Sequence, residues 1–284
     1  MSAPPKPPPP KPPTASPPPS RTTESTPTRS FSTSHGVSAK AHKVVIYGPG
    51  GVGKTDLCSN LQQVGINPLF ADLEDGSKFL DVSRVWPTPE TLEELHQVLR
   101  DPSTWKDFDA IVIDSFTRAE ELAKTWVIKH VSHEKPGRTI KSIEDYGWGK
   151  GYVHSYEAFL TILQDLDAII RAGKHVIATA HNCTAKVPNP KGEDFIRYEP
   201  RLQSPPSGMG AIRHRVFEWS DHTFFLGFDQ TAEDGKVAGS GTRTIYPIPL
   251  PTHMAKSRTL SDEVPYLQGD AEIWKQLFNI ERES

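Results

Sequence analysis

The chain has 284 residues, a formal net charge of −3 and 36% hydrophobic residues, so it is long enough for one or two globular domains. This near-neutral charge excludes bulk electrostatic binding of nucleic acid and leaves only local basic loops for that role. No run approaches the roughly 18 apolar residues of a membrane span, and neither Cys58 nor Cys183 lies in a zinc or disulfide motif. We therefore expect a cytoplasmic protein with no membrane contact.

Residues 1–40 are dominated by proline, lysine, serine and threonine and hold few large apolar residues. Such a composition cannot bury enough surface to offset the entropy of ordering, so it predicts a disordered tail with polyproline II character. Its Pro-x-x-Pro spacings suit a tether or partner ligand, and a solubilising tail is the alternative. Residues 41–284 are the predicted folded domain, which is large enough for a single core.

From residue 43 onward, short apolar runs alternate with segments of helical periodicity. We expect strands at 44–47, 67–72, 109–115, 174–181, 222–228 and 242–248, and helices at 55–64, 91–100, 118–130, 156–172 and 271–279. The segments 131–151 and 182–216 are expected to be irregular, the second because it contains five prolines. This alternation predicts an α/β fold: a mostly parallel sheet flanked by helices, with antiparallel strands at its C-terminal edge.

The segment between the first strand and the first helix matches the pattern G-x-x-x-x-G-K-S/T in full. It consists of Gly48, Pro49, Gly50, Gly51, Val52, Gly53, Lys54 and Thr55. In such a P-loop, backbone N–H groups surround the phosphates, the lysine reaches the β and γ phosphates, and the threonine hydroxyl ligates Mg²⁺. The segment therefore predicts binding of a nucleoside triphosphate, ATP, with Mg²⁺; a glycine-rich turn before an ordinary helix is the alternative.

Acidic residues follow two other predicted strands. Parallel strands deliver their carboxyl ends to one edge of a sheet, so Asp114 is expected to hold Mg²⁺ beside the P-loop. Glu74 is the candidate that orients and deprotonates the attacking water. Asp72 and Asp75 compete for that role, since an acidic strand end also forms solvated turns and helix caps.

Three successive motifs resemble the core of RecA-type ATPases. They are residues 70–74, 111–115 and 176–181. More closely, the chain resembles phage ATP-binding proteins that consist of a RecA core alone, the Sak-type single-strand annealing proteins. The features that suggest this are residues 145–149, 181–182 and 255–258, and the resemblance covers roughly residues 43–266. It implies a RecA-like ATPase core, located in the host cytoplasm if a phage encodes the chain.

The resemblance also implies roles for individual residues. An acid after the second strand activates water in that family, which favours Glu74, and His181 is the implied sensor of the γ phosphate. Lys256 and Arg258 are implied to reach a neighbouring subunit's phosphates. The alternatives are a histidine that closes a buried strand and two solvated surface cations. The implied assembly is a homo-oligomer, a ring or short filament, that binds ATP at subunit junctions.

The two irregular segments lie where RecA-like proteins place their DNA-binding loops. Their candidate DNA-binding cations are Lys135, Arg138, Lys141, Lys186, Arg197, Arg201, Arg213 and Arg215. Cations interleaved with aromatic residues such as Trp148 suit the backbone and bases of single-stranded DNA. Because acids such as Glu193 are interspersed, a solvated mobile loop is the alternative.

Together these observations predict an ATP-dependent, single-stranded-DNA-binding recombination protein that anneals or pairs strands and hydrolyses ATP. A single-strand-binding protein or another replication or recombination protein is its expected partner. A nucleotide-gated adaptor or loader that binds a protein partner is the alternative, and a small-molecule or nucleotide kinase is a third hypothesis. The kinase is disfavoured because Glu74 indicates water as the phosphoryl acceptor.

Overall fold

The computed structural model describes residues 33, 35, 41–233 and 236–279, and the side chains of residues 230–240 are left undescribed. Apart from Thr33 and His35, the expected tail at residues 1–40 lies outside the described residues. Within the described chain, no helix has the length and apolar character that a bilayer crossing requires.

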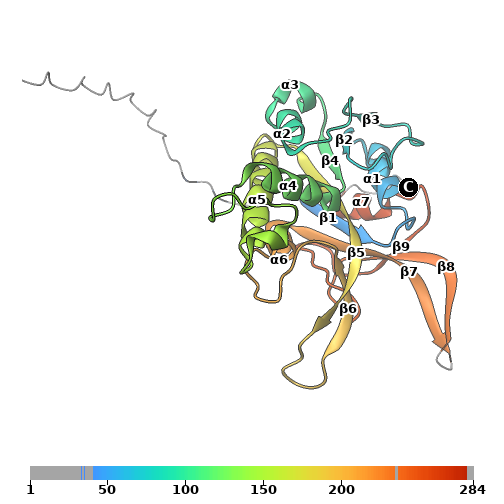
Figure 1. The fold of residues 1–284 in the computed structure, drawn as a ribbon. Helices are drawn as coiled ribbons and strands as arrows, with labels where there is room; N and C mark the ends of the chain where they lie inside the picture. Colours follow the sequence, from blue (N-terminus) through green and yellow to red (C-terminus); the bar gives the residue numbers. More distant parts are fainter. Residues whose placement is uncertain (1–32, 34, 36–40, 234–235, 280–284) are drawn as a thin grey trace, which may run out of the picture. The chain divides into compact units, whose positions relative to one another are not determined.

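The domain is built on one mixed sheet (Figure 1). Its strands are β1 (Lys43–Gly48), β2 (Pro68–Asp72), β3 (Ser83–Arg84), β4 (Ala110–Asp114), β5 (His175–Val187), β6 (Phe195–Pro200), β7 (His222–Glu233), β8 (Lys236–Tyr246) and β9 (Val264–Tyr266). The order across the sheet is β3-β2-β4-β5-β1-β7-β8-β9, with β6 paired to β5. All pairs from β3 to β7 are parallel, whereas β7, β8 and β9 pair antiparallel. The expected sheet, mostly parallel with antiparallel C-terminal strands, is confirmed.

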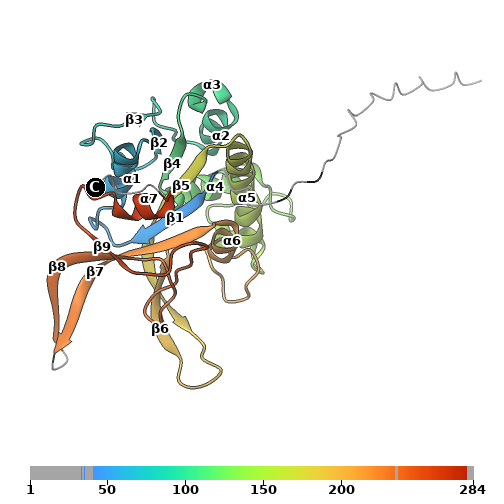
Figure 2. The same cartoon turned by 180° about the vertical axis from the view of Figure 1, so that it is seen from behind.

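Helices cover both faces of the sheet. They are α1 (Lys54–Ser59), α2 (Leu92–Arg100), α3 (Pro102–Trp105), α4 (Phe116–His130), α5 (Lys150–Arg171), α6 (Ile212–Trp219) and α7 (Glu272–Leu277), with short 3₁₀ segments η1 (Asn60–Val64) and η2 (Ile143–Tyr146). Alternate strand residues such as Val45 and Ile113 pack against α2, α4, α5 and α6 (Figure 1). The intervening residues, such as Val44 and Val112, pack against α1 and α7 on the opposite face (Figure 2).

The expected loop at residues 182–216 is wrong. Strand β5 continues to Val187 and forms an antiparallel hairpin with β6, which projects from the sheet (Figure 1), and α6 begins at Ile212. The prolines do not interrupt this ladder, because Pro188 and Pro190 lie in the turn and Pro200 ends β6. The backbone N–H groups of the hairpin therefore stay paired.

Other boundaries also differ from expectation. β7 and β8 form a longer hairpin than residues 222–228 and 242–248 indicate, and the segment 131–151 contains η2 and the first residues of α5. The helix expected at 91–100 begins with a cap at Thr91: its hydroxyl accepts a bond from Glu94 N at 3.2 Å, and the Glu94 carboxylate accepts one from Thr91 N at 3.1 Å. This reciprocal capping box fixes the start of α2.

Three histidines meet at the amino-terminal edge of the sheet, where β1, β5 and β7 begin. His42 Nδ1 lies 3.1 Å from His222 Nε2, and His42 N donates to His175 Nδ1 at 3.1 Å. Burial, followed by the neighbouring His42 ring, lowers the pKa of both His175 and His222 to about 4. The cluster is therefore neutral in the folded protein at neutral pH.

Stability should fall as the pH drops from about 6.5 to about 4, because the unfolded chain takes up protons on these histidines while the folded protein does not. Thermal unfolding midpoints measured across this range test the prediction. The difference in unfolding midpoint between the native protein and His222→Gln should become smaller toward pH 4. The midpoint of His130→Gln, a change at an exposed site, should vary with pH as that of the native protein does. A constant gap for His222→Gln would contradict it.

Candidate nucleotide-binding site

The P-loop connects β1 to α1 and lies at the carboxyl edge of the sheet. A Cβ atom at Gly48 would lie 2.1 Å from the Leu226 carbonyl oxygen, so only glycine lets β7 approach this closely. Gly53, the residue before α1, has φ of +102°, a backbone conformation that side chains disfavour. The motif glycines at these two positions are therefore required by the backbone.

Lys54 is a buried cation at the mouth of this loop. Its Nζ donates to Gly48 O at 3.0 Å and to Pro49 O at 2.9 Å, and the residue is only 8% exposed. Burial lowers the pKa of Lys54, although the nearby Asp114 and Glu74 carboxylates oppose the shift. A phosphate group would restore the charge compensation that solvent no longer supplies.

Asp114 ends β4 and lies across from the P-loop. Its carboxylate accepts hydrogen bonds from Thr55 Oγ1 at 2.6 Å and from the Thr179 hydroxyl of β5. Burial raises the pKa of Asp114, the two hydroxyl groups oppose this, and the Asp72 and Glu74 charges add to it. The carboxylate is thus held in an environment where a bound cation would strongly favour its ionised form.

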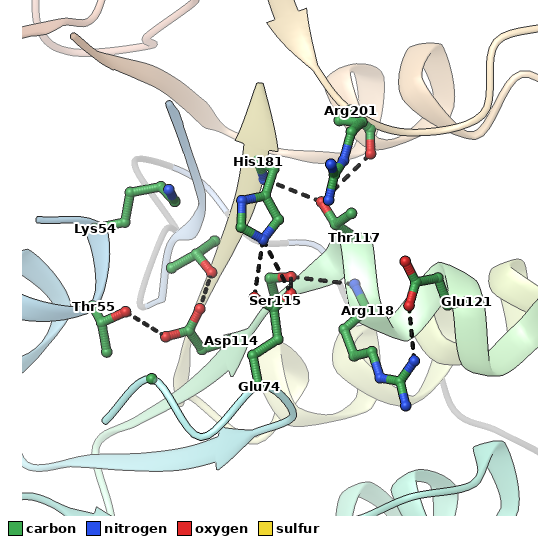
Figure 3. Close-up of polar contacts among 12 residues, drawn as sticks. Lys54, Thr55, Glu74, Asp114, Ser115, Thr117, Arg118, Glu121, His181 and Arg201 are labelled. Atoms are coloured by element: carbon green, nitrogen blue, oxygen red, sulfur yellow. Dashed lines mark hydrogen bonds and ion pairs between the residues drawn. The ribbon is translucent and has the colours of Figure 1, made fainter. Parts of the chain in front are cut away.

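Glu74 and His181 lie together at this edge (Figure 3). His181 Nε2 is 2.9 Å from Glu74 Oε2, and the Ser115 hydroxyl donates to Glu74 Oε1. Both the Glu74 and His181 side chains are about 30% exposed, so solvent reaches them. The carboxylate is therefore fixed by two partners while one side remains open.

The structure separates Glu74 from its two competitors. The Asp72 carboxylate accepts bonds from the backbone N–H groups of Glu74, Gly76 and Ser77 at 3.2, 3.1 and 2.7 Å, and Asp72 is 5% exposed. It therefore builds the turn that presents Glu74. Asp75 is exposed and has φ of +56° in that turn. Of the three acids, only Glu74 pairs with His181.

Strand order explains how these side chains meet. β5 lies between β1 and β4, and the register places His181 beside Gly48. His181 N donates to Thr117 Oγ1 at 3.1 Å, and its carbonyl accepts from Arg201 N at 2.8 Å. At His181, β5 therefore contacts the P-loop, the start of α4 and the base of the β5–β6 hairpin.

These residues line a cavity of about 310 Å³, within the size range of small-molecule sites. Its lining is Gly50, Gly51, Gly53, Lys54, Thr55, Asp56, Glu74, Gly76, Asp114, Ser115 and His181. A groove of about 530 Å³ between β3 and α2 contains none of the sequence-predicted site residues.

The donor set fits a hard cation bound together with phosphates. Thr55 and Asp114 supply a hydroxyl and a carboxylate, and Glu74 adds a second carboxylate nearby. Among the described residues, no three His, Cys, Asp or Glu side chains gather closely enough to hold a metal by themselves. The pair of Thr55 and Asp114 suits Mg²⁺, which takes few protein ligands and completes its shell with water and substrate phosphates.

Comparison with known proteins agrees with this geometry. A model of the AAA_24 family, described as an AAA domain, matches residues 40–259. The chain belongs to the AAA_24 family. It is an AAA-domain P-loop ATPase, and binding of a nucleotide follows from this membership.

Among solved structures, the AAA-domain ATPase is similar to a KaiC-like protein from the hyperthermophilic archaeon Pyrococcus horikoshii OT3. The two share 13% sequence identity with a TM-score of 0.39, over 79% of this chain and 84% of that one. No curated protein matches the chain.

The cations expected to act in trans lie away from the ATPase's own P-loop. Lys256 pairs with Thr223 at the start of β7, and Arg258 bonds to Asp221 Oδ1 at 2.9 Å. Because β7 begins beside the amino-terminal end of β1, both residues are at the opposite edge of the sheet from Thr55. The structure does not bring them to the site of the same subunit.

The candidate DNA-binding cations fall into two groups. Lys135, Arg138 and Lys141 are exposed, but they follow α4 rather than the end of β4. In the second group most side chains have acidic partners: Lys186 pairs with Asp194 at 2.9 Å, Arg197 and Arg213 with Glu199 at 2.8 and 2.6 Å, and Arg215 with Glu218 at 4.0 Å.

Arg201 differs from the rest of this group. It is exposed and forms no ion pair with any described residue, and it lies at the base of the hairpin, bonded through its backbone to His181. It is near enough to the nucleotide site for its charge to lower the pKa of Lys54 slightly, alongside the dominant effect of burial. Arg201 therefore lies between the hairpin and the nucleotide site.

Sequence reasoning missed two site residues of this ATPase. Thr179 lies two positions before His181 on β5, so the alternation of a strand could have placed it on the same face. Ser115 caps α4 by accepting a bond from Arg118 N at 3.2 Å, and a serine between a strand and a helix indicates such a cap. Its second bond, to Glu74, could not be read from the sequence.

Replacing Lys54 with alanine should lower ATP hydrolysis by at least about a hundredfold, because the only buried cation at the described site is lost. Steady-state phosphate release measures this. Since Lys54 bonds only to carbonyls of its own loop, circular dichroism and the thermal midpoint should remain close to those of the native protein. Retained hydrolysis by a folded variant would contradict the assignment.

Proposed function

We propose that this ATPase hydrolyses ATP with Mg²⁺ held by Thr55 and Asp114. Lys54 would then contact the β and γ phosphates, whose developing charge a Mg²⁺ ion held by Thr55 and Asp114 would help to neutralise. Glu74 accepts a proton from the attacking water, for which its partly exposed carboxylate at the cavity wall is suited. His181, from the strand beside the P-loop, senses the terminal phosphate.

The pairing of Glu74 with His181 supports this division of roles. In the structure, His181 Nε2 contacts Oε2 of the Glu74 carboxylate, so this oxygen is not free to accept a proton from water. A γ phosphate that attracts His181 would free that oxygen for water. Ser115 keeps its bond to the other oxygen, so Glu74 would stay oriented while its partner moves.

We further propose that the protein is an ATP-dependent single-stranded-DNA-binding recombination protein, which anneals or pairs strands as the phage Sak-type proteins it resembles do. The observation that carries this proposal is the continuity of β5: the strand that ends the site at His181 runs without a break into an exposed hairpin. A movement of His181 in response to the bound nucleotide can thereby affect DNA held by the hairpin. Arg201, at the base of the hairpin, is the first residue to contact a DNA phosphate.

Assembly is part of the same proposal. Lys256 and Arg258 lie at the edge of the sheet away from their own P-loop, which is the placement that action on a neighbouring subunit needs. A homo-oligomer, as a ring or short filament, would bring them to a second ATP site. A single-strand-binding protein, or another replication or recombination protein, would deliver the DNA.

Glu74→Gln should retain ATP binding and lose hydrolysis by about a hundredfold or more, because glutamine keeps the shape of the side chain and cannot accept the proton. ATP affinity and turnover measured on the same preparation test this. Asp75→Asn, a change at the exposed neighbour in the same turn, is the matched control and should remain active. Unchanged turnover in Glu74→Gln would remove this residue from the role.

Single-stranded DNA should stimulate ATP hydrolysis, and Arg201→Ala should reduce that stimulation severalfold while turnover without DNA is maintained. The assay compares turnover with and without an oligonucleotide at stated salt, beside Lys54→Ala as the inactive reference. Arg171→Ala removes an exposed arginine at the far end of α5 and should behave like the native protein. A flat response to DNA in the native protein would overturn the DNA proposal.

A second candidate function is a nucleotide-gated adaptor or loader that binds a protein partner. The specific observation is a set of exposed apolar side chains: Ile196 on the hairpin is 68% exposed, Met209 before α6 is 63% exposed, and Trp148 before α5 is 98% exposed. The ion pairs within the hairpin also leave it with little free positive charge. Filter binding of a labelled oligonucleotide separates the two functions, since an adaptor would retain none at physiological salt.

A further inference from the structure

The cavity at the P-loop is suited to phosphates and a cation, and it offers no surface for a nucleoside. Its lining contains glycines, Lys54, Thr55, three acids, a serine and His181, without a Phe, Tyr or Trp side chain. Nucleobases are bound chiefly by stacking on aromatic rings and guanidinium groups. The base of ATP must therefore find its contacts next to this cavity.

The order of the strands determines on which side of the P-loop cavity the nucleoside must lie. Glu74, Asp114 and His181, which surround the terminal phosphate, come from β2, β4 and β5, all on one side of β1. The opposite end of the triphosphate then points to the other side of β1, where β7, β8 and β9 lie. Gly53 and Asp56 line the cavity toward this side.

A row of three cross-strand neighbours borders the P-loop there. Phe228 pairs with Arg243 between β7 and β8, and Arg243 pairs with Tyr266 between β8 and β9, so the three side chains share one face. The next row, Leu226, Ile245 and Val264, is buried in the core. Phe228, Arg243 and Tyr266 therefore form the next row outward from the core, and Phe228 is its solvent-exposed member.

This row contacts the P-loop directly. Arg243 donates to Val52 O at 3.1 Å, and the Tyr266 hydroxyl donates to Asp56 Oδ2 at 2.5 Å. A Cβ atom at Gly53 would lie 2.9 Å from an Arg243 guanidinium nitrogen, which shows how closely the row and the loop approach. The guanidinium carbon is 5.9 Å from the ring centres of both Phe228 and Tyr266.

The members of this row differ in their exposure to solvent. Phe228 is 40% exposed, whereas Tyr266 is 3% exposed and is held by its hydroxyl. A flat apolar ring beside a planar cation is the combination on which a purine base stacks. We propose that the nucleoside half of ATP binds against this row, with the base stacked on the exposed surface of Phe228 and Arg243.

The test compares ATP with inorganic tripolyphosphate, which has the same phosphates and no nucleoside. Isothermal titration with Mg²⁺, in the absence of DNA, should show that Phe228→Ala raises the Kd for ATP roughly tenfold or more and leaves the Kd for tripolyphosphate unchanged. Arg243→Lys, which keeps the charge and removes the planar face, should show the same selective loss. Because no DNA is present, the outcome is independent of the proposed recombination function.

Phe79→Ala is the matched control, since Phe79 is 90% exposed on the segment that follows β2, on the other side of the P-loop. This variant should bind ATP like the native protein. An equal loss of ATP and tripolyphosphate binding in Phe228→Ala would mean that the row only supports the loop, and would overturn the proposal. An unchanged ATP Kd, or a selective loss in Phe79→Ala instead, would overturn it as well.

Discussion

The buried carboxylate of Asp114 is the constraint around which the site is organised. Burial disfavours its charge, the nearby Asp72 and Glu74 add repulsion, and only two hydroxyl groups bond to it. Such a group is stable as an anion only next to positive charge. Lys54 supplies part of this, and a cation that arrives with a nucleotide would supply the rest. The same charge imbalance would make binding of a metal–nucleotide complex favourable.

Features of this site that depend on residues close together in the sequence could be predicted, whereas features that depend on the order of the strands could not. The P-loop is a contiguous pattern, and the capping box at Thr91 requires only residues three positions apart, so both were predictable. Asp114 followed from the rule that parallel strands deliver their ends to one edge. The bonds from Thr179 and Ser115 depend instead on which strands are neighbours, and a pattern along the chain does not contain that order.

The β5–β6 hairpin shows a different limit. Its prolines indicated a loop, but each lies in the turn or at a strand end, where no backbone hydrogen bond is lost. The number of prolines in a segment does not indicate where each one falls relative to the hydrogen-bonding register of the two strands. The correction matters for function, because a flexible loop after His181 would absorb a displacement of that residue. A paired strand that continues from the sheet would transmit it.

The C-terminal strands extend the same reasoning beyond residues 40–259, which match the family. Tyr266 of β9 bonds to Asp56, and Trp274 Nε1 of α7 donates to Leu57 O at 2.7 Å, so residues past position 259 hold the middle of α1. Since α1 carries Lys54 and Thr55, the position of the phosphate-binding residues depends on this later segment. Glu74 and Asp114 come from β2 and β4 on one side of β1, whereas α1 is held by β9 on the other side and by α7. The complete nucleotide site is therefore larger than the region that defines the family.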